Sequence, residues 1–260
     1  MNPYRWQEKN LEVQTMKYRL YGNSGLRVSE VSLGTMTFGE DWGWGSAKDE
    51  SRKVYDAYRA AGGNFVDTAN LYTNGTSETL VGEFIRDHRQ SVVLATKYTN
   101  AIAGSDPNAA GNHRKSMVQA LEASLRRLKT DYIDLYWLHI WDQMTPVEEI
   151  MRAFDDLVSQ GKVLYIGVSD APAWWIAQAN TLADLRGWTQ FVGLQIEYSL
   201  IERSVERETH SDGEGIQAGP RRMVASCWRP VERQVSFRRC GGWPVLERNG
   251  QGIPAHRRAY

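Results

Sequence analysis

Cysteine is scarce in this chain, and long apolar runs are missing. Only two cysteines occur among its 260 residues, Cys227 and Cys240, which supports neither a disulfide framework nor a cysteine-rich metal site. No stretch approaches the roughly 20 apolar residues that a membrane-spanning helix needs, and residues 1–15 lack the apolar core of a secretory signal. We therefore expect a cytoplasmic protein that has no membrane partner and no metal.

An excess of charge of either sign is also lacking. The 31 basic residues equal the 31 acidic residues, so the formal net charge is zero, and neither nucleic acid nor an anionic membrane is expected as a partner. A small neutral ligand is a more suitable partner for a chain without net charge than either of these. A length of 260 residues with 42% hydrophobic residues allows one large core and is sufficient for a (β/α)₈ barrel.

Short apolar runs alternate with amphipathic stretches from Met16 onward, which is typical of repeated βα units and a parallel sheet. Residues 17–20 and 26–28 flank a turn at Gly22–Gly25 and are predicted to form a β-hairpin. Six further strands are predicted at residues 31–33, 64–67, 92–97, 133–139, 163–169 and 191–197. Thr145, which precedes Pro146, is predicted to cap the helix that Gly161 ends.

Four polar residues follow three consecutive predicted strands, where parallel barrels place their chemistry. They are Asp67, Tyr72, Lys97 and His139. Taken singly, each has an ordinary structural explanation: a turn-forming aspartate, a packed tyrosine, a surface lysine and a structural histidine. Taken together, they favour a catalytic site.

This arrangement resembles the aldo-keto reductase family. The Asp67-Thr-Ala-x-x-Tyr72 segment, the strand-ending Lys97 and the Leu-His139-x-x-Asp142 segment match the family in order and spacing, and the resemblance covers residues 16–208. It points to the branch with bacterial aryl-alcohol dehydrogenases and potassium-channel β-subunits. The resemblance implies an α/β fold, a (β/α)₈ TIM barrel with a hairpin plug, here incomplete with about six βα units and the last two lost. It also implies NADP(H)-dependent reduction of aldehydes or ketones to alcohols.

The four residues also suit this chemistry on physical grounds. Reducing a carbonyl requires a proton donor besides a hydride donor, and tyrosine, with an ordinary pKa of about 10, is a weak acid unless its phenolate is stabilised. The ammonium of Lys97 would favour the phenolate of Tyr72, and Asp67 would keep that ammonium charged. His139 could donate a hydrogen bond to the carbonyl oxygen as negative charge develops there.

The resemblance further implies a set of residues that contact the nicotinamide or line its edge. Asp170 stands where the family commonly has asparagine, so an acceptor replaces an amide. A helix cap at Ser169 and Asp170, and a buried Gln195 bonded to backbone, are the alternative interpretations. The residues expected to bind the cofactor are Gly34, Thr35, Met36, Asp67, Ser169, Asp170 and Gln195.

Residues 209–260 differ in character from the rest of the chain. They contain no lysine, nine arginines and seven glycines, without strand–helix alternation. We expect three segments: an N-terminal extension at 1–15, a truncated aldo-keto reductase domain at 16–208, and an unrelated, disordered tail at 209–260.

A reading-frame hypothesis explains this tail. Residues 223–235, back-translated and read one base forward, can encode Trp-Ser-Pro-Leu-Ala-Gly-Gly-Leu-Leu-Ser-Gly-Lys-Tyr, which matches the family's seventh-strand segment. We therefore hypothesise a one-base frameshift near codons 207–212.

Three alternatives to an active reductase are an inactive pseudoenzyme, a non-catalytic regulator and a metal-dependent hydrolase. An inactive pseudoenzyme and a non-catalytic nicotinamide-binding regulator keep the same fold, whereas a metal-dependent hydrolase would need histidine ligands that are not placed beside His139. Trp42, Trp44 and Trp141 are candidates for an apolar substrate pocket or for loop packing. The substrate and the oligomeric state are not predicted.

Overall fold

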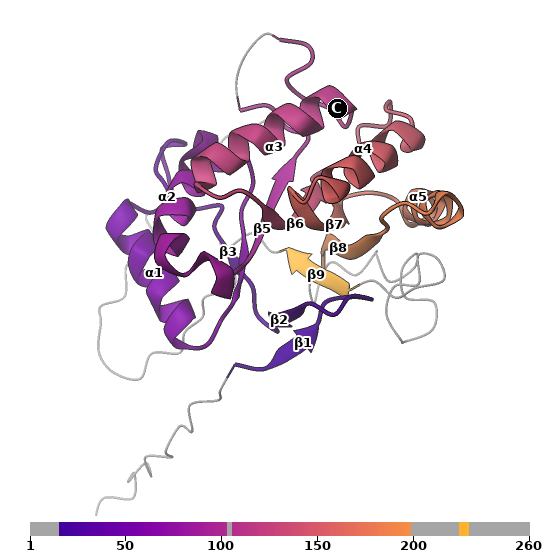
Figure 1. The fold of residues 1–260 in the computed structure, drawn as a ribbon. Helices are drawn as coiled ribbons and strands as arrows, with labels where there is room; N and C mark the ends of the chain where they lie inside the picture. Colours follow the sequence, from indigo (N-terminus) through magenta and orange to yellow (C-terminus); the bar gives the residue numbers. More distant parts are fainter. Residues whose placement is uncertain (1–15, 103–105, 199–223, 229–260) are drawn as a thin grey trace, which may run out of the picture. The chain divides into compact units, whose positions relative to one another are not determined.

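The computed structural model describes residues 16–102 and 106–198, and the backbone of 224–228, all within one compact unit, Met1–Trp228. A hairpin of β1 (Tyr18–Leu20) and β2 (Arg27–Ser29) precedes a parallel sheet (Figure 1). The sheet strands are β3 (Leu33–Gly34), β4 (Phe65–Asp67), β5 (Val93–Tyr98), β6 (Ile133–Leu138), β7 (Val163–Ser169), β8 (Phe191–Glu197) and β9 (Val224–Trp228).

These sheet strands pair in the order of the sequence, from β3 to β9, and every pairing is parallel. The predicted hairpin and the six predicted strands are confirmed. In the described part of the chain no pairing joins β3 to β9, so the barrel is incomplete.

Helices follow the strands, as the alternating pattern predicts. They are α1 (Lys48–Ala60), α2 (Thr76–Ile85), α3 (Arg114–Leu128), α4 (Val147–Ser159) and α5 (Ala173–Arg186), with short 3₁₀ segments η1 (Tyr72–Gly75) and η2 (Arg86–Ser91). Among the described residues, no helix combines the length and the apolarity that crossing a bilayer requires.

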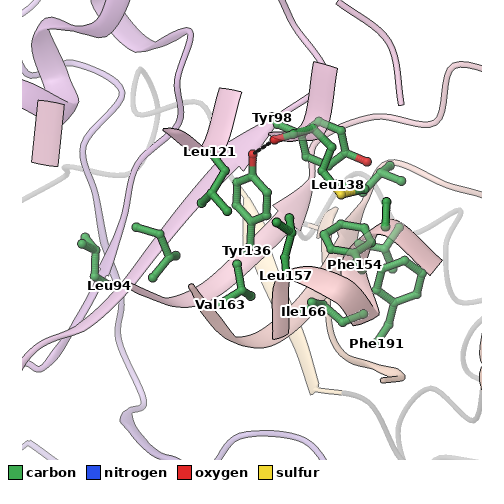
Figure 2. Packing of buried hydrophobic residues seen from close by; sticks show 14 of the residues in the cluster. Leu94, Tyr98, Leu121, Tyr136, Leu138, Phe154, Leu157, Val163, Ile166 and Phe191 are labelled. Carbon is green, nitrogen blue, oxygen red and sulfur yellow. Dashed lines mark hydrogen bonds between the residues drawn. The ribbon is translucent and has the colours of Figure 1, made fainter. Parts of the chain in front are cut away.

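The larger hydrophobic cluster lies between the strands and these helices. Tyr136 of β6 and Ile166 of β7 pack with Leu121 of α3 and Phe154 of α4 (Figure 2). The Tyr136 hydroxyl donates to the backbone carbonyl of Met117 at 3.1 Å, so the polar end of this buried ring is satisfied.

A second cluster lies on the opposite face of the strands and includes the hairpin. Tyr21 packs edge-on against Phe65 of β4, with ring centroids 5.5 Å apart, in a cluster that also contains Trp137 of β6. A Cβ on Gly193 of β8 would come within 2.3 Å of the Tyr21 hydroxyl, so this close approach requires glycine.

Strand alternation determines which residues reach the site. Val93 and Ala95 belong to the second cluster, called here the inner cluster, whereas Leu94 belongs to the larger, outer cluster between strands and helices. Because side chains alternate along a strand, Lys97 follows Ala95 on the inner face, and His139 follows Trp137 in the same way. The predicted site residues therefore share the inner face at the carboxyl ends of the strands.

Two features differ from the predictions. Strand β9 lies within the tail for which no strand was expected, and its backbone pairs with the edge of β8. An edge strand presents unpaired backbone groups that can template another strand, and Val224 and Trp228 are residue types that suit one. The capping prediction for Thr145 is wrong: helix α4 begins at Val147, and the Thr145 hydroxyl donates to Asp142 at 2.6 Å.

Candidate active site

The ammonium of Lys97 is the centre of the candidate site. It is completely buried at the end of β5 and lies 2.5 Å from Oδ2 of Asp67. It also donates to the Tyr72 hydroxyl and to the backbone carbonyl of Thr68, both at 2.9 Å. All three donor positions of the ammonium are therefore used, which offsets the cost of burying a charge.

The two oxygens of the Asp67 carboxylate accept hydrogen bonds from three donors. Oδ1 accepts from the indole nitrogen of Trp137 at 3.1 Å. Oδ2 accepts from Lys97 and, in a longer contact of 3.4 Å, from Nε2 of Gln195. The buried ion pair is thus supported by neutral donors on β6 and β8, which holds both charges in one geometry.

The turn that follows β4 places Tyr72 over Lys97. Thr73 and Asn74 directly after it have φ of 45° and 54°, in the left-handed region that costs energy for a β-branched residue. The Thr73 hydroxyl holds this conformation by donating to the carbonyl of Phe38 at 2.6 Å and accepting from the backbone N–H of Ser77 at 3.0 Å. The tyrosine position is therefore fixed by its own turn.

Burial and charge act in opposite directions on the pair of Lys97 and Tyr72. Burial lowers the pKa of Lys97, but the Asp67 carboxylate and Tyr72 outweigh it and raise that pKa above its ordinary value. Burial raises the pKa of Tyr72 by more than Lys97 lowers it. We expected Lys97 to favour the phenolate, and it acts in that direction, but the net result is a tyrosine that keeps its proton at neutral pH.

His139 follows β6 and faces Tyr72. The two rings meet edge to face with centroids 6.1 Å apart. Burial, with a smaller contribution from the charge of Lys97, lowers the pKa of His139 to about 3. The imidazole is therefore neutral at physiological pH and can donate one hydrogen bond.

The residues expected to contact the cofactor lie along the same ends of the strands. Ser169 of β7 and Gln195 of β8 are register partners and are both buried. Gly34 is the register partner of Asp67, and the buried backbone N–H of Thr35 donates to the Asp67 carbonyl at 3.0 Å, while Met36 is half-buried. The sequence thus predicted residues from four strands that come together at one edge.

Asp170 and its neighbours are not explained by helix capping. Helix α5 begins with Pro172 at its N-cap position and has no side-chain capping bond. Asp170 has φ of 42°, a left-handed conformation that asparagine and aspartate adopt more readily than most residues. The backbone at this position therefore accepts aspartate as well as the asparagine common in the family.

Three residues of the site were missed by sequence reasoning. Trp137 was part of an apolar run, and Thr99 and Asn100 belonged to no motif. The signal for Trp137 was available, because it lies two residues before His139 and therefore on the same face of β6. Nothing in the sequence marks the contacts of Thr99 and Asn100 with His139, which depend on the turn after β5.

No group of three or more His, Cys, Asp or Glu side chains that could hold a metal ion occurs among the residues that the structure describes. The polar groups at this edge are instead a lysine–carboxylate pair, a tyrosine and a neutral histidine. Such a set can transfer a proton to, and hydrogen-bond, an oxygen that gains negative charge.

Comparison with known proteins identifies the family of this chain. Residues 30–212 match the model of the aldo/keto reductase family. The chain is 43% identical over 211 residues to norsolorinic acid reductase of Aspergillus flavus, covering 76% of this chain and 54% of the relative. It is 43% identical over 198 residues to the NADP(+) aryl-alcohol dehydrogenase of Phanerodontia chrysosporium, covering 71% of this chain and 51% of the relative.

The chain thus spans about half the length of the curated relatives it matches. The family match includes Asp67, Tyr72, Lys97 and His139, and it covers more than half of the chain. This protein belongs to the aldo/keto reductase family.

Proposed function

We propose that this chain binds NADP(H) and reduces a small aldehyde or ketone to the corresponding alcohol. The observation that carries the proposal is the buried ammonium of Lys97, which contacts the Tyr72 hydroxyl and the Asp67 carboxylate at once. A protonated tyrosine bonded to a charged lysine can donate its proton, because the ammonium already stabilises the phenolate that is left.

The side chains divide the reaction between them. When bound, NADPH supplies the hydride that adds to the carbonyl carbon. Tyr72 gives its phenolic proton to the carbonyl oxygen, so the product is the neutral alcohol, and Lys97 stabilises the phenolate that remains. Asp67 keeps Lys97 charged throughout. His139, neutral at physiological pH, donates a hydrogen bond that positions and polarises the carbonyl oxygen.

The nicotinamide would be held at the edge formed by β3, β7 and β8. Ser169 and Asp170 offer a hydroxyl and a carboxylate, Gln195 offers an amide, and Gly34, Thr35 and Met36 line the other side. These groups fit a carboxamide, because it presents both a donor and an acceptor. Asp170→Asn restores the amide common in the family, and we expect it to tighten NADPH binding.

We propose an aromatic carbonyl substrate. Trp141 lies two residues after His139, and its ring meets that of Trp174 edge to face at 5.5 Å. Trp174 is 61% exposed, so an aromatic surface is available beside the candidate site. Trp42 and Trp44 form a second pair, with ring centroids 5.4 Å apart, on the loop after β3. One matched relative, the NADP(+) aryl-alcohol dehydrogenase of Phanerodontia chrysosporium, is also named for aromatic alcohols.

NADPH binding and turnover test the proposal together. NADPH added to the purified chain should quench its tryptophan fluorescence, more weakly when NADH replaces it. An aromatic aldehyde should then oxidise the bound NADPH. The control for Asp170→Asn is Asp106→Asn, which makes the same chemical change at an exposed loop residue. Absence of quenching by either nucleotide would contradict cofactor binding.

A non-catalytic or inactive nicotinamide-binding protein is the alternative. It keeps the same fold and the same residues at the nicotinamide edge, and differs from the reductase only in lacking turnover. We propose that the frameshift near codons 207–212 accounts for residues 209–260. Resequencing of the gene tests this proposal, and an intact frame would contradict it. If NADPH binds and aldehydes are not reduced, while a frame-restored chain reduces them, the altered tail is the cause of inactivity.

A further inference from the structure

The imidazole of His139 has a neighbour on the side away from its expected substrate. Nδ2 of Asn100 lies 3.4 Å from Nδ1 of the ring, in a long hydrogen bond. In this orientation the Asn100 amide turns its nitrogen toward the ring, and because an amide nitrogen only donates, Nδ1 accepts and carries no proton. A neutral imidazole has one proton, which must then be on Nε2.

A hydrogen bond to its backbone carbonyl fixes the position of Asn100. Its carbonyl oxygen accepts from Nδ2 of Asn70 at 2.8 Å. Asn70 is itself 5% exposed, and its backbone N–H donates to the carbonyl of Lys97 at 3.1 Å. The position of Asn100 is therefore tied to the end of the strand that carries the lysine.

Thr99, which directly precedes Asn100 in this turn, holds the backbone of His139. The hydroxyl of Thr99 accepts from the His139 N–H at 3.3 Å and from Nδ2 of Asn112 at 2.9 Å. Thr99 has φ of 99°, which is rare for a β-branched residue and is kept here by these contacts. Consecutive residues thus contact the backbone and the ring of the same histidine.

We propose that Asn100 is a positioning residue that fixes His139 as its Nε2-protonated tautomer. The inference rests on the proposed function, because this tautomer leaves Nε2–H free to donate to a carbonyl oxygen. The opposite tautomer would direct a lone pair at that oxygen and could not polarise it. Holding an imidazole in the wrong tautomer can lower kcat by about 10⁴ in enzymes that use a histidine.

The tautomer can be measured without turnover. Two-bond ¹⁵N–¹H correlation spectra of the chain labelled at histidine report which ring nitrogen carries the proton, and His139→Gln identifies the signal. We expect Nε2–H for His139 at neutral pH. Asn100→Asp should move the proton to Nδ1, because a carboxylate there accepts, and Asn100→Ala should give a mixture. Asn108→Asp adds the same charge to an exposed residue of the following loop and should leave the tautomer unchanged.

The outcomes separate this proposal from the proposed function. Nδ1–H in the unmodified chain would overturn it, as would a tautomer that stays the same in both Asn100 variants while the signals of His88 and His113 show that the fold is kept. Nε2–H that shifts in Asn100→Asp would support it even if no aldehyde is reduced. In an active chain, Asn100→Asp should lower kcat by at least about tenfold and change KM little.

Discussion

The indole N–H of Trp137 donates to Oδ1 of Asp67 over 3.1 Å, from β6 to β4 across the intervening strand β5. Lys97 of that intervening strand binds the other oxygen of the same carboxylate. The ion pair is thus part of a chain of side-chain hydrogen bonds that crosses three neighbouring strands. Several donors to one buried carboxylate offset the cost of removing it from water.

Trp137→Phe removes this N–H while keeping an aromatic ring in the inner cluster. We expect the free energy of unfolding to fall by about 1–3 kcal/mol, because one oxygen of a buried carboxylate loses its donor. Denaturant unfolding followed by circular dichroism measures the change. An unfolding free energy equal to that of the unmodified chain would show that the bond does not contribute.

Removing one charge of the ion pair should lower the free energy of unfolding more than removing both charges. Asp67→Asn leaves the Lys97 ammonium buried without its counter-charge, and Lys97→Met leaves the carboxylate in the same state. Each should destabilise the chain by about 3–5 kcal/mol. The double variant should lose clearly less than the sum of the two. Additive losses in unfolding experiments would mean that the charges are not coupled.

Most of the strands and the four polar residues were predictable, because local patterns determine them. Apolar runs such as residues 133–138 mark strands buried on both faces, and the residues that follow them can be identified without knowing the fold. The contacts of Asn100 were not predictable, since they depend on a left-handed backbone at Thr99 that no residue type signals. Strand β9 depends on the free edge of β8, which is a property of the assembled sheet.

Acid should destabilise the chain partly through His139. Its pKa is lowered to about 3 in the folded chain, while an unfolded histidine titrates near about 6.5. Between these values the unfolded state binds more protons, so stability falls as the pH falls from 6.5 to about 3 and is unaffected above 6.5. His139→Gln should flatten the plot of unfolding free energy against pH in this window. Parallel curves for both chains would contradict the lowered pKa.

The inner cluster should resist added volume at Gly167. A Cβ there would lie 2.4 Å from the Trp137 ring, so Gly167→Ala must displace that ring and with it the donor to Asp67. We expect a loss of about 1–3 kcal/mol in the free energy of unfolding. Gly25→Ala is the control, because a Cβ at Gly25 meets nothing within 4 Å. Equal stability of the two variants would show that the core yields more easily than its packing indicates.

The central claim is that Tyr72, whose phenolate is stabilised by contact with the Lys97 ammonium, donates the proton in carbonyl reduction. The most direct test compares Tyr72→Phe with the unmodified chain in two measurements, NADPH binding by fluorescence quenching and NADPH oxidation with an aromatic aldehyde. The account predicts binding that is unchanged within about twofold and a kcat lower by about 10²–10⁴. Turnover by the phenylalanine variant at the unmodified rate would contradict it.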